Sequence, residues 1–402
     1  MVLKLKYQGL ILVVVFFLFS CNHQAVRKEK TTISAYQNLS RQPEKPVSTM
    51  PLAASQLVVS EQKRPIIPKP KPTLILKPAI DTLTPGEVKT ISAKPGLSKL
   101  GENRQKPTEV KNPSVPTMFR VRFDNDIFDN TDYYYTNGIQ LSLYTAVAGR
   151  SPFSRLLIKA KNGILLQGFS LTQNIYTPTV PEAENISYGD YPFSGFLAIS
   201  QFSESYNLHR KLIVKSSIGL GVLGPASMSG TVQASVHEKE PVGWKYQIAN
   251  SPVIHYSLSV EKGVYSSRHF EWNMTGKVEV GTLFDDIQTG TYLRAGRFTQ
   301  VLRGYQFPAS NGFRRDFQFW FFLKGNLKLV GYNATLQGGM FNDKSPYVIP
   351  ATQVSRLVAE TSAGVALYYG NFGVELENIY NSPEFKGAYD FRYGRISLLF
   401  GF

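Results

Sequence analysis

The runs FRVRF at residues 119–123, IQLSL at 139–143 and FEWNM at 270–274 alternate apolar with polar side chains. Alternation with a period of two predicts β-strands with two unlike faces. About twelve such runs occur after Met118, covering residues 118–124, 134–146, 163–175, 193–204, 210–223, 252–263, 269–284, 289–298, 316–332, 355–369, 372–380 and 391–402. No segment has a convincing amphipathic helical period. The sequence therefore predicts an all-β domain without helices.

Three features favour a membrane barrel over the alternative, a secreted β-sandwich. The runs have the length of tilted strands that cross a bilayer. Aromatic residues gather near strand ends, as in a membrane girdle, among them Tyr133, Tyr134, Tyr135, Phe317, Trp320, Phe321, Phe322, Tyr368 and Tyr369. The last strand ends in Phe402, which resembles the C-terminal signature of outer-membrane barrels. We therefore expect a twelve-stranded antiparallel transmembrane β-barrel over residues 118–402.

The first residues are typical of an export signal. Lys4 and Lys6 precede an apolar run at 9–19 that is too short for a transmembrane helix. The run ends in LFSC at 18–21, which resembles a bacterial lipobox, and Cys21 is the only cysteine of the chain. We predict a lipoprotein signal peptide at 1–20 and lipidation of Cys21. The alternative is a simple signal peptide with an incidental cysteine.

Residues 21–117 are expected to form a disordered tether after the lipidated cysteine. Residues 22–117 hold 13 of the 24 prolines and a single aromatic residue, Tyr36, so they cannot bury enough apolar surface to fold. Residues 1–117 also carry +11 of the net charge of +15. These cations are scattered among prolines, whereas a nucleic-acid binder gathers them on a folded face, so nucleic acid is excluded as a partner.

An even number of strands places both ends of the barrel chain on one side of the membrane. An anchor at Cys21 makes that side periplasmic. The opposite connections are predicted to be the longer set, as expected for outward loops, over residues 125–133, 176–192, 224–251, 285–288, 333–354 and 381–390. The sequence thus predicts an integral outer-membrane barrel with an N-terminal lipid anchor on the periplasmic side.

The first outward connection is rich in short oxygen donors. The stretch DNDIFDNTDYYYTN at 124–137 holds four aspartates and three asparagines, which suits a calcium ion. The alternative is a polar turn that caps its own backbone.

In the longest outward connection, His237 is the only one of five histidines that we place in an outward loop. A base that activates water, together with a cation that polarises a carbonyl, makes an ester hydrolase conceivable. Alternatively, His237 is an ordinary surface residue.

Six ordered motifs resemble those of the lipid A 3′-O-deacylase family and span most of 118–402. They are Asn125-Asp126, YYTNG at 134–138, NIYTP at 174–178, GVLGP at 221–225, Gln233 with His237, and GW at 243–244 with Gln247. The resemblance implies an outer-membrane barrel that hydrolyses the 3′-linked acyloxyacyl ester of lipid A, within lipopolysaccharide of the outer leaflet, with calcium.

The resemblance also assigns roles to individual residues. His237 activates the water, Asn125 and Asp126 form the metal and oxyanion end, and Thr136 completes the polar wall and the metal site. Glu240 is the acidic candidate, and Glu238 is equally eligible because the segment from His237 to Trp244 is shorter than in the family. The second outward connection reads PEAE at 181–184, where the family has a basic residue.

Two other functions remain open from the sequence. One is an outer-membrane phospholipase, although the sequence contains no G-x-S-x-G elbow of a serine hydrolase. The other is a non-enzymatic barrel, for which a lipid anchor has some logic, since an integral barrel needs no anchor. The oligomeric state does not follow from the sequence.

Overall fold

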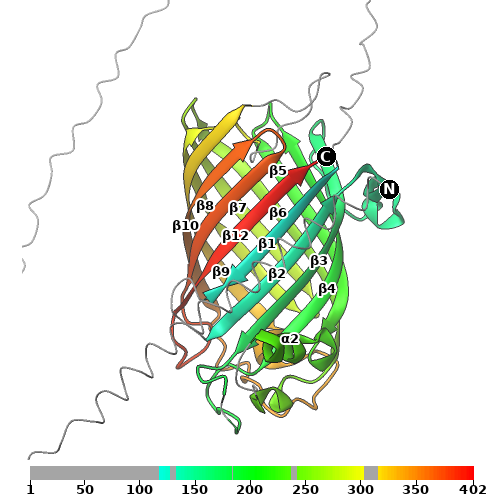
Figure 1. Ribbon diagram of the computed structural model, residues 1–402, viewed down its shortest axis with the longest axis vertical. Coiled ribbons are helices and arrows are strands. Elements are labelled where there is room, and N and C mark those ends of the chain that lie inside the picture. Colours follow the sequence, from blue (N-terminus) through cyan, green and yellow to red (C-terminus); the bar gives the residue numbers. More distant parts are fainter. Residues whose placement is uncertain (1–116, 127–132, 183, 237–241, 303–315) are drawn as a thin grey trace, which may run out of the picture. The chain divides into compact units, whose positions relative to one another are not determined.

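The computed structural model describes residues 117–126, 133–182, 184–236, 242–302 and 316–402. The predicted signal peptide, Cys21 and almost all of the tether lie outside these residues. Twelve strands form a closed barrel in which every strand runs antiparallel to its neighbours (Figure 1). β1 (Met118–Asn125) pairs with β12 (Phe391–Gly401) to close it. This confirms the twelve-stranded antiparallel barrel expected from the alternation.

The other strands follow in chain order around the wall. They are β2 (Tyr134–Tyr144), β3 (Ile164–Thr177), β4 (Ser194–Asn207), β5 (Leu212–Leu223), β6 (Ser251–Ser266), β7 (Phe270–Gly281), β8 (Phe284–Arg297), β9 (Phe317–Asn333), β10 (Leu357–Tyr369) and β11 (Phe372–Asn381). We call the end with Met118 and Gly401 the inward end and the opposite end the outward end. Most predicted strand limits agree with these bounds to within about three residues, the error expected of pattern reasoning.

One predicted connection is wrong. Residues 285–288 belong to β8, and β7 and β8 are joined by residues 282–283 alone. Asp285 and Asp286 look like turn residues in the sequence, because aspartate is common in turns. In the structure Asp285 Oδ1 instead accepts a hydrogen bond of 2.8 Å from the backbone N–H of Gly281, across the tight turn.

The expectation of no helices is also wrong, but only within the connections. Short helices lie there, namely η2 (Ala146–Arg150), η3 (Pro152–Arg155), η4 (Pro225–Ser227), α2 (Ser229–Val236), η5 (Val242–Tyr246) and α3 (Ala334–Gln337). Each is too short to give a recognisable apolar period. Within the described residues, no helix has both the length and the apolar character needed to cross a membrane.

The strand faces separate as alternation requires. Arg120, Arg122 and Asp124 of β1 line an interior cavity of 460 Å³. The outer face carries exposed apolar side chains along the strands, including Leu143, Leu171, Ile199, Leu220, Ile254, Ile287, Leu323 and Leu327. A barrel with polar side chains inside and apolar side chains outside is built for lipid on its outer surface.

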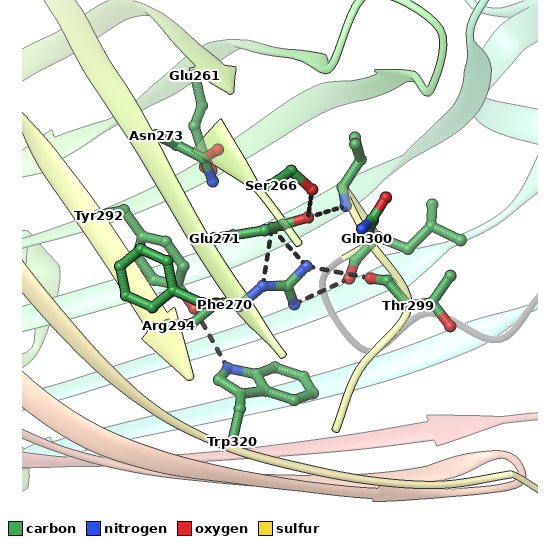
Figure 2. A network of polar contacts seen from close by, with 12 residues as sticks. Glu261, Ser266, Phe270, Glu271, Asn273, Tyr292, Arg294, Thr299, Gln300 and Trp320 are labelled. Atoms are coloured by element: carbon green, nitrogen blue, oxygen red, sulfur yellow. Dashed lines mark hydrogen bonds and ion pairs between the residues drawn. The ribbon is translucent and has the colours of Figure 1, made fainter. Parts of the chain in front are cut away.

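The inward end of the lumen is filled by a packed core. Buried side chains from nine strands meet there with Val301 and Leu302 of the β8–β9 connection, and the Trp320 and Tyr368 rings stack at 5.2 Å. Figure 2 shows how the start of this connection is held: Arg294 forms a buried ion pair of 2.7 Å with Glu271 and donates to the carbonyl oxygens of Thr299 and Leu302. The backbone of residues 299–302 is thereby fixed inside the barrel.

A second core closes the outward end. Tyr135, Val358, Ile379 and Tyr393 on the strands pack with side chains of the outward loops, namely Tyr191, Leu336, Ile349, Val354 and Phe385. The polar cavity therefore lies between two layers of packed side chains.

Candidate functional site

Three neighbouring strand ends carry a polar cluster at the outward end. The Asn125 Nδ2 atom donates to the carbonyl oxygen of Thr136 at 3.2 Å. The Thr136 hydroxyl is 2.6 Å from the hydroxyl of Thr177, and both threonines are buried. A β-bulge between Tyr135 and Asn137 makes Thr136 an extra residue in the pairing with β3, and bulges often redirect a side chain near functional sites. We call Asn125, Thr136 and Thr177 the rim cluster.

Asp124 does not belong to the rim cluster, although it is adjacent to Asn125 in the sequence. Its carboxylate lies in the lumen, with both oxygens 2.7 Å from Arg395 and one accepting the Tyr135 hydroxyl at 2.9 Å. Because side chains alternate along a strand, the Asn125 side chain lies on the outer face of the barrel, away from the lumen. Asp126 follows and is buried. Asp129 and Asp132 lie outside the described residues. Because Asp124 is paired with Arg395 in the lumen, it is separated from the other aspartates of the first connection.

Helix α2 lies against the outer wall beside β3 and β4, near the outward end (Figure 1). Gln173, on the outer face of β3, donates to the carbonyl oxygen of Ser227 at 2.6 Å. A Cβ atom on Gly195 of β4 would lie 2.0 Å from the Ser229 hydroxyl oxygen. A glycine at position 195 is therefore what allows the helix to approach the wall so closely.

An apolar cluster holds the same loop in place. Ile175 on the outer face of β3 packs with Phe193 and Trp244, and Val232 of α2 packs against them. The rings of Phe193 and Trp244 are 5.2 Å apart. Helix α2 and Trp244, within the described part of the longest outward loop, are thus fixed on the outer wall of the barrel.

Two buried donors in this loop have no hydrogen-bond partner among the described residues. They are Nε2 of Gln233, a side chain only 2% exposed, and Nε1 of Trp244. A buried donor left unsatisfied costs about 1–3 kcal/mol, so such groups are usually kept for a ligand, solvent or a functional partner. Both residues belong to the motifs that resemble the family, but their sequence pattern alone indicates no role for either.

The predicted base and its acidic partner fall outside the described residues. His237, Glu238 and Glu240 follow α2 directly in the chain, and α2 ends at Val236. Of the other histidines, His255 faces the lumen, where its Nε2 lies 3.1 Å from Glu279. His209 and His269 lie in turns at the inward end, as expected.

The donors near the rim cluster fit a hard cation by their chemistry. Asn125, Asp126 and Thr136 offer amide, carboxylate, carbonyl and hydroxyl oxygens, which are ligands that calcium prefers. Within the described part of the chain, no three His, Cys, Asp or Glu side chains meet to form a metal site. A cation here would therefore depend on amide, hydroxyl and backbone oxygens around one carboxylate.

The second outward connection contains no positive charge. Residues 178–193 hold no lysine or arginine, and Glu182 and Glu184 are exposed. Asp190 caps this connection by accepting the Thr179 N–H at 2.8 Å and its hydroxyl at 2.5 Å. The loop therefore has an internal frame but presents no cation to an anionic ligand.

The fold and this site define an outer-membrane β-barrel whose candidate site lies on the outer wall, which also carries the packed helix of an outward loop. The profile of the family Outer membrane protein LpxR matches residues 98–402, and the chain belongs to that family. The match begins within the predicted tether, 20 residues before the domain limit expected from the alternation. It confirms the resemblance seen in the motifs and an outer-membrane location.

The barrel fold is shared with a solved structure. LpxR from Salmonella typhimurium is 19% identical, with a TM-score of 0.57, and the match covers 71% of this chain and all of that one. The β domain of the Bordetella autotransporter BrkA is 11% identical, with a TM-score of 0.37, and covers 72% of this chain and all of that one. Among curated proteins, none matches the chain.

Proposed function

We propose that the protein is a calcium-dependent esterase that removes the 3′-linked acyloxyacyl group of lipid A in the outer leaflet. The observation that carries this proposal is the position of the rim cluster. Polar side chains on the outer wall of a membrane barrel face lipid, and here they are buried beside a loop that brings two unsatisfied donors to the same wall. A lipid of the outer leaflet reaches such a site without entering the lumen.

The roles follow from the chemistry of each side chain. His237 takes a proton from a water molecule, whose oxygen bonds to the ester carbonyl carbon. The bond between that carbon and the 3′-oxygen of the sugar then breaks, and the proton on His237 passes to the departing oxygen, which leaves a free fatty acid and a sugar hydroxyl. His237 lies four residues after Gln233 in the chain, so both belong to the loop that begins on the outer wall. The Gln233 amide donates to the water or to the ester oxygen. Glu240, or Glu238, orients the histidine.

Asn125 and Asp126 are the main ligands in this proposal. Thr136 contributes its carbonyl oxygen or its hydroxyl, although each already has a hydrogen-bond partner in Asn125 or Thr177. When bound, calcium stabilises the negative charge that develops on the carbonyl oxygen. The amide oxygen of Asn125 and the carboxylate of Asp126 would hold the cation at the outer wall.

Hydrolysis by the purified protein in detergent tests the proposal. We expect release of the 3′-acyloxyacyl group from lipid A, and loss of that activity in Asp126→Asn and in excess chelator. A fall of at least roughly a hundredfold is typical when a preorganised charge at the reacting oxygen is removed. Undiminished activity in Asp126→Asn would contradict the site, and undiminished activity in chelator would contradict the cation.

The same assay with phosphatidylethanolamine examines the phospholipase alternative. We expect no release of fatty acid from this lipid under conditions in which lipid A is hydrolysed. The non-enzymatic alternative would include a pore, and packed side chains that cross the lumen at both ends argue against one. Phospholipid hydrolysis without lipid A hydrolysis would transfer the proposal to the other lipid.

A further inference from the structure

The connection between β2 and β3 does not form a tight turn at the inward end. Residues 145–161, which we call the strap, lie back against the outer wall of the barrel. Gln201 of β4 donates to the Ala148 carbonyl oxygen at 2.7 Å, and Ser216 of β5 donates to that of Ile158 at 2.9 Å. The strap lies on the outside of the wall, on the side of β3 and β4 (Figure 1).

The strap covers polar side chains on the lipid-facing side of the wall. The hydrogen bonds of Gln201 and Ser216 to the strap place both side chains on the outer face, in agreement with strand alternation. Each of the covered polar residues is at most 8% exposed, namely Gln167, Gln201, Ser203, Ser205 and Ser216. Polar groups facing hydrocarbon are costly unless paired. Here Gln167 donates to the Ser154 hydroxyl at 2.8 Å and Ser205 accepts the Ala160 N–H at 2.7 Å.

The strap presents an apolar surface in place of this polar patch. Val147, Phe153, Leu156 and Ile158 are between 48% and 61% exposed. In a soluble protein four such neighbours would be unusual, but on the outer wall of a membrane barrel they lie where acyl chains lie. The strap therefore restores an apolar surface over the polar wall.

The charge of the strap is of one sign. The β2–β3 connection, residues 145–163, contains Arg150, Arg155, Lys159 and Lys161 and no aspartate or glutamate. Arg150 and Arg155 are exposed at the last turns of η2 and η3, and Lys161 is also exposed. Lys159 is turned back toward the strap itself and donates to the Ser154 carbonyl oxygen at 2.9 Å. Exposed apolar side chains beside unopposed cations are typical of segments that lie in a membrane interface.

We propose that the strap is a binding surface for anionic phospholipid of the periplasmic leaflet. Val147, Phe153, Leu156 and Ile158 contact acyl chains, and Arg150, Arg155 and Lys161 contact the phosphates. The inward end is the periplasmic one, because outer-membrane barrels carry their longer loops outside. This surface lies at the opposite end of the barrel from the rim cluster, so the inference does not rest on the proposed esterase activity.

Native mass spectrometry of the full chain tests the lipid selectivity. The protein is incubated in detergent micelles that contain equal amounts of phosphatidylglycerol and phosphatidylethanolamine, and is then released from the micelles in the spectrometer. The number of lipid molecules of each kind that stay bound to the protein is counted. We expect preferential retention of phosphatidylglycerol, reduced in Arg150→Gln/Arg155→Gln by roughly thirtyfold at low salt, since each cation contributes about 1 kcal/mol near an anionic surface.

The matched control is Lys344→Gln/Lys386→Gln, which removes two exposed charges from the outward loops. We expect this variant to retain phosphatidylglycerol like the parent protein. Equal retention in both double variants, or no preference for phosphatidylglycerol in the parent, would overturn the proposal. Far-UV circular dichroism establishes that both variants remain folded.

A second measurement tests the apolar part of the surface separately. Phe153→Trp and Tyr188→Trp place a fluorophore on the strap and on an outward loop where Tyr188 is 77% exposed. In phosphatidylethanolamine–phosphatidylglycerol vesicles with brominated acyl chains, we expect strong quenching of the tryptophan at 153 and little at 188, after subtraction of the parent emission. Quenching at 153 as weak as that at 188 would show that the strap does not enter the bilayer. A protein partner would then become the better explanation of its apolar surface.

Discussion

At the scale of single residues, the direction of a side chain decides its role. Asp124 and Asn125 are adjacent, yet Asp124 pairs with Arg395 in the lumen and Asn125 contacts Thr136 on the rim. The sequence alone presented the four aspartates of this connection as one possible calcium cluster. Alternation along a strand would place Asp124 and Asn125 on opposite faces. That argument holds only if the strand includes Asn125, and the strand predicted from the sequence ended at residue 124.

Gln233 provides a prediction at this scale. Its Nε2 atom is buried and has no partner in the described part of the chain, so replacing it with methionine removes no internal hydrogen bond at that nitrogen. We expect Gln233→Met to lower kcat on lipid A by at least roughly tenfold, as for loss of one hydrogen bond to the reacting groups, while the thermal midpoint in detergent stays unchanged. A purely structural residue would behave in the opposite way, with a lower midpoint and normal turnover.

Glu384 gives a pH dependence at the same scale. It lies in the connection between β11 and β12, where burial raises the pKa of its carboxyl above the ordinary value; Glu360 adds to the rise, while Lys328 and Tyr191 oppose it. The folded protein thus holds this proton more tightly than the unfolded chain. Its contribution to stability is therefore complete below the unfolded pKa, near 4.3, and is lost as the pH rises through the folded pKa.

We accordingly expect Glu384→Gln to raise the thermal midpoint at pH 7 and to flatten its decline between acidic and neutral pH. Thermal unfolding in detergent across that range is the measurement. Glu182→Gln, in an exposed position of another outward loop, is the matched control and should follow the parent curve. A steeper decline in the Glu384 variant than in the parent would contradict this assignment.

At the scale of elements, the decisive contact is between α2 and the wall. Gln173 bonds the backbone just before the helix, and the apolar cluster around Trp244 packs against it. The absence of a side chain at Gly195 gives the helix room to approach β4. Sequence patterns could not predict this helix, because its eight residues are too few for a clear apolar period. What was recognisable was the order of the motifs on either side of it.

The contact at Gly195 can be tested directly. Valine at this position would place its Cβ 2.0 Å from the Ser229 hydroxyl oxygen, so the helix must move away from β4. We expect Gly195→Val to reduce lipid A hydrolysis at least roughly a hundredfold, because small displacements of positioning elements have effects of that size, while the barrel remains folded.

The control for this variant is Gly325→Val, also on a strand, where a Cβ atom would meet nothing within 4 Å. Heat-modifiable migration in gel electrophoresis reports on the barrel in both variants. Full activity in Gly195→Val would mean that the position of α2 against the wall is irrelevant to catalysis.

At the scale of the whole molecule, the sequence predicted the barrel well because alternation is a direct consequence of its two environments. Each strand has a lumen and a lipid face, and both leave a period of two in the sequence. The strap and the two lumen cores were not predicted. They depend on connections that fold back onto the wall or into the lumen, and such contacts between distant residues have no periodic trace. The roles of His237 and Glu240 remain predictions.

Mass spectrometry of lipid A tests the proposed activity most directly, in cells that express the full chain compared with cells that express His237→Ala. We predict that the 3′-acyloxyacyl group is missing only in cells with the parent protein, and that both proteins are folded in the outer membrane. Unchanged lipid A in both samples, with folded barrel present, would contradict the proposed activity. Loss of the group in both would leave the enzyme in place and remove His237 as its base.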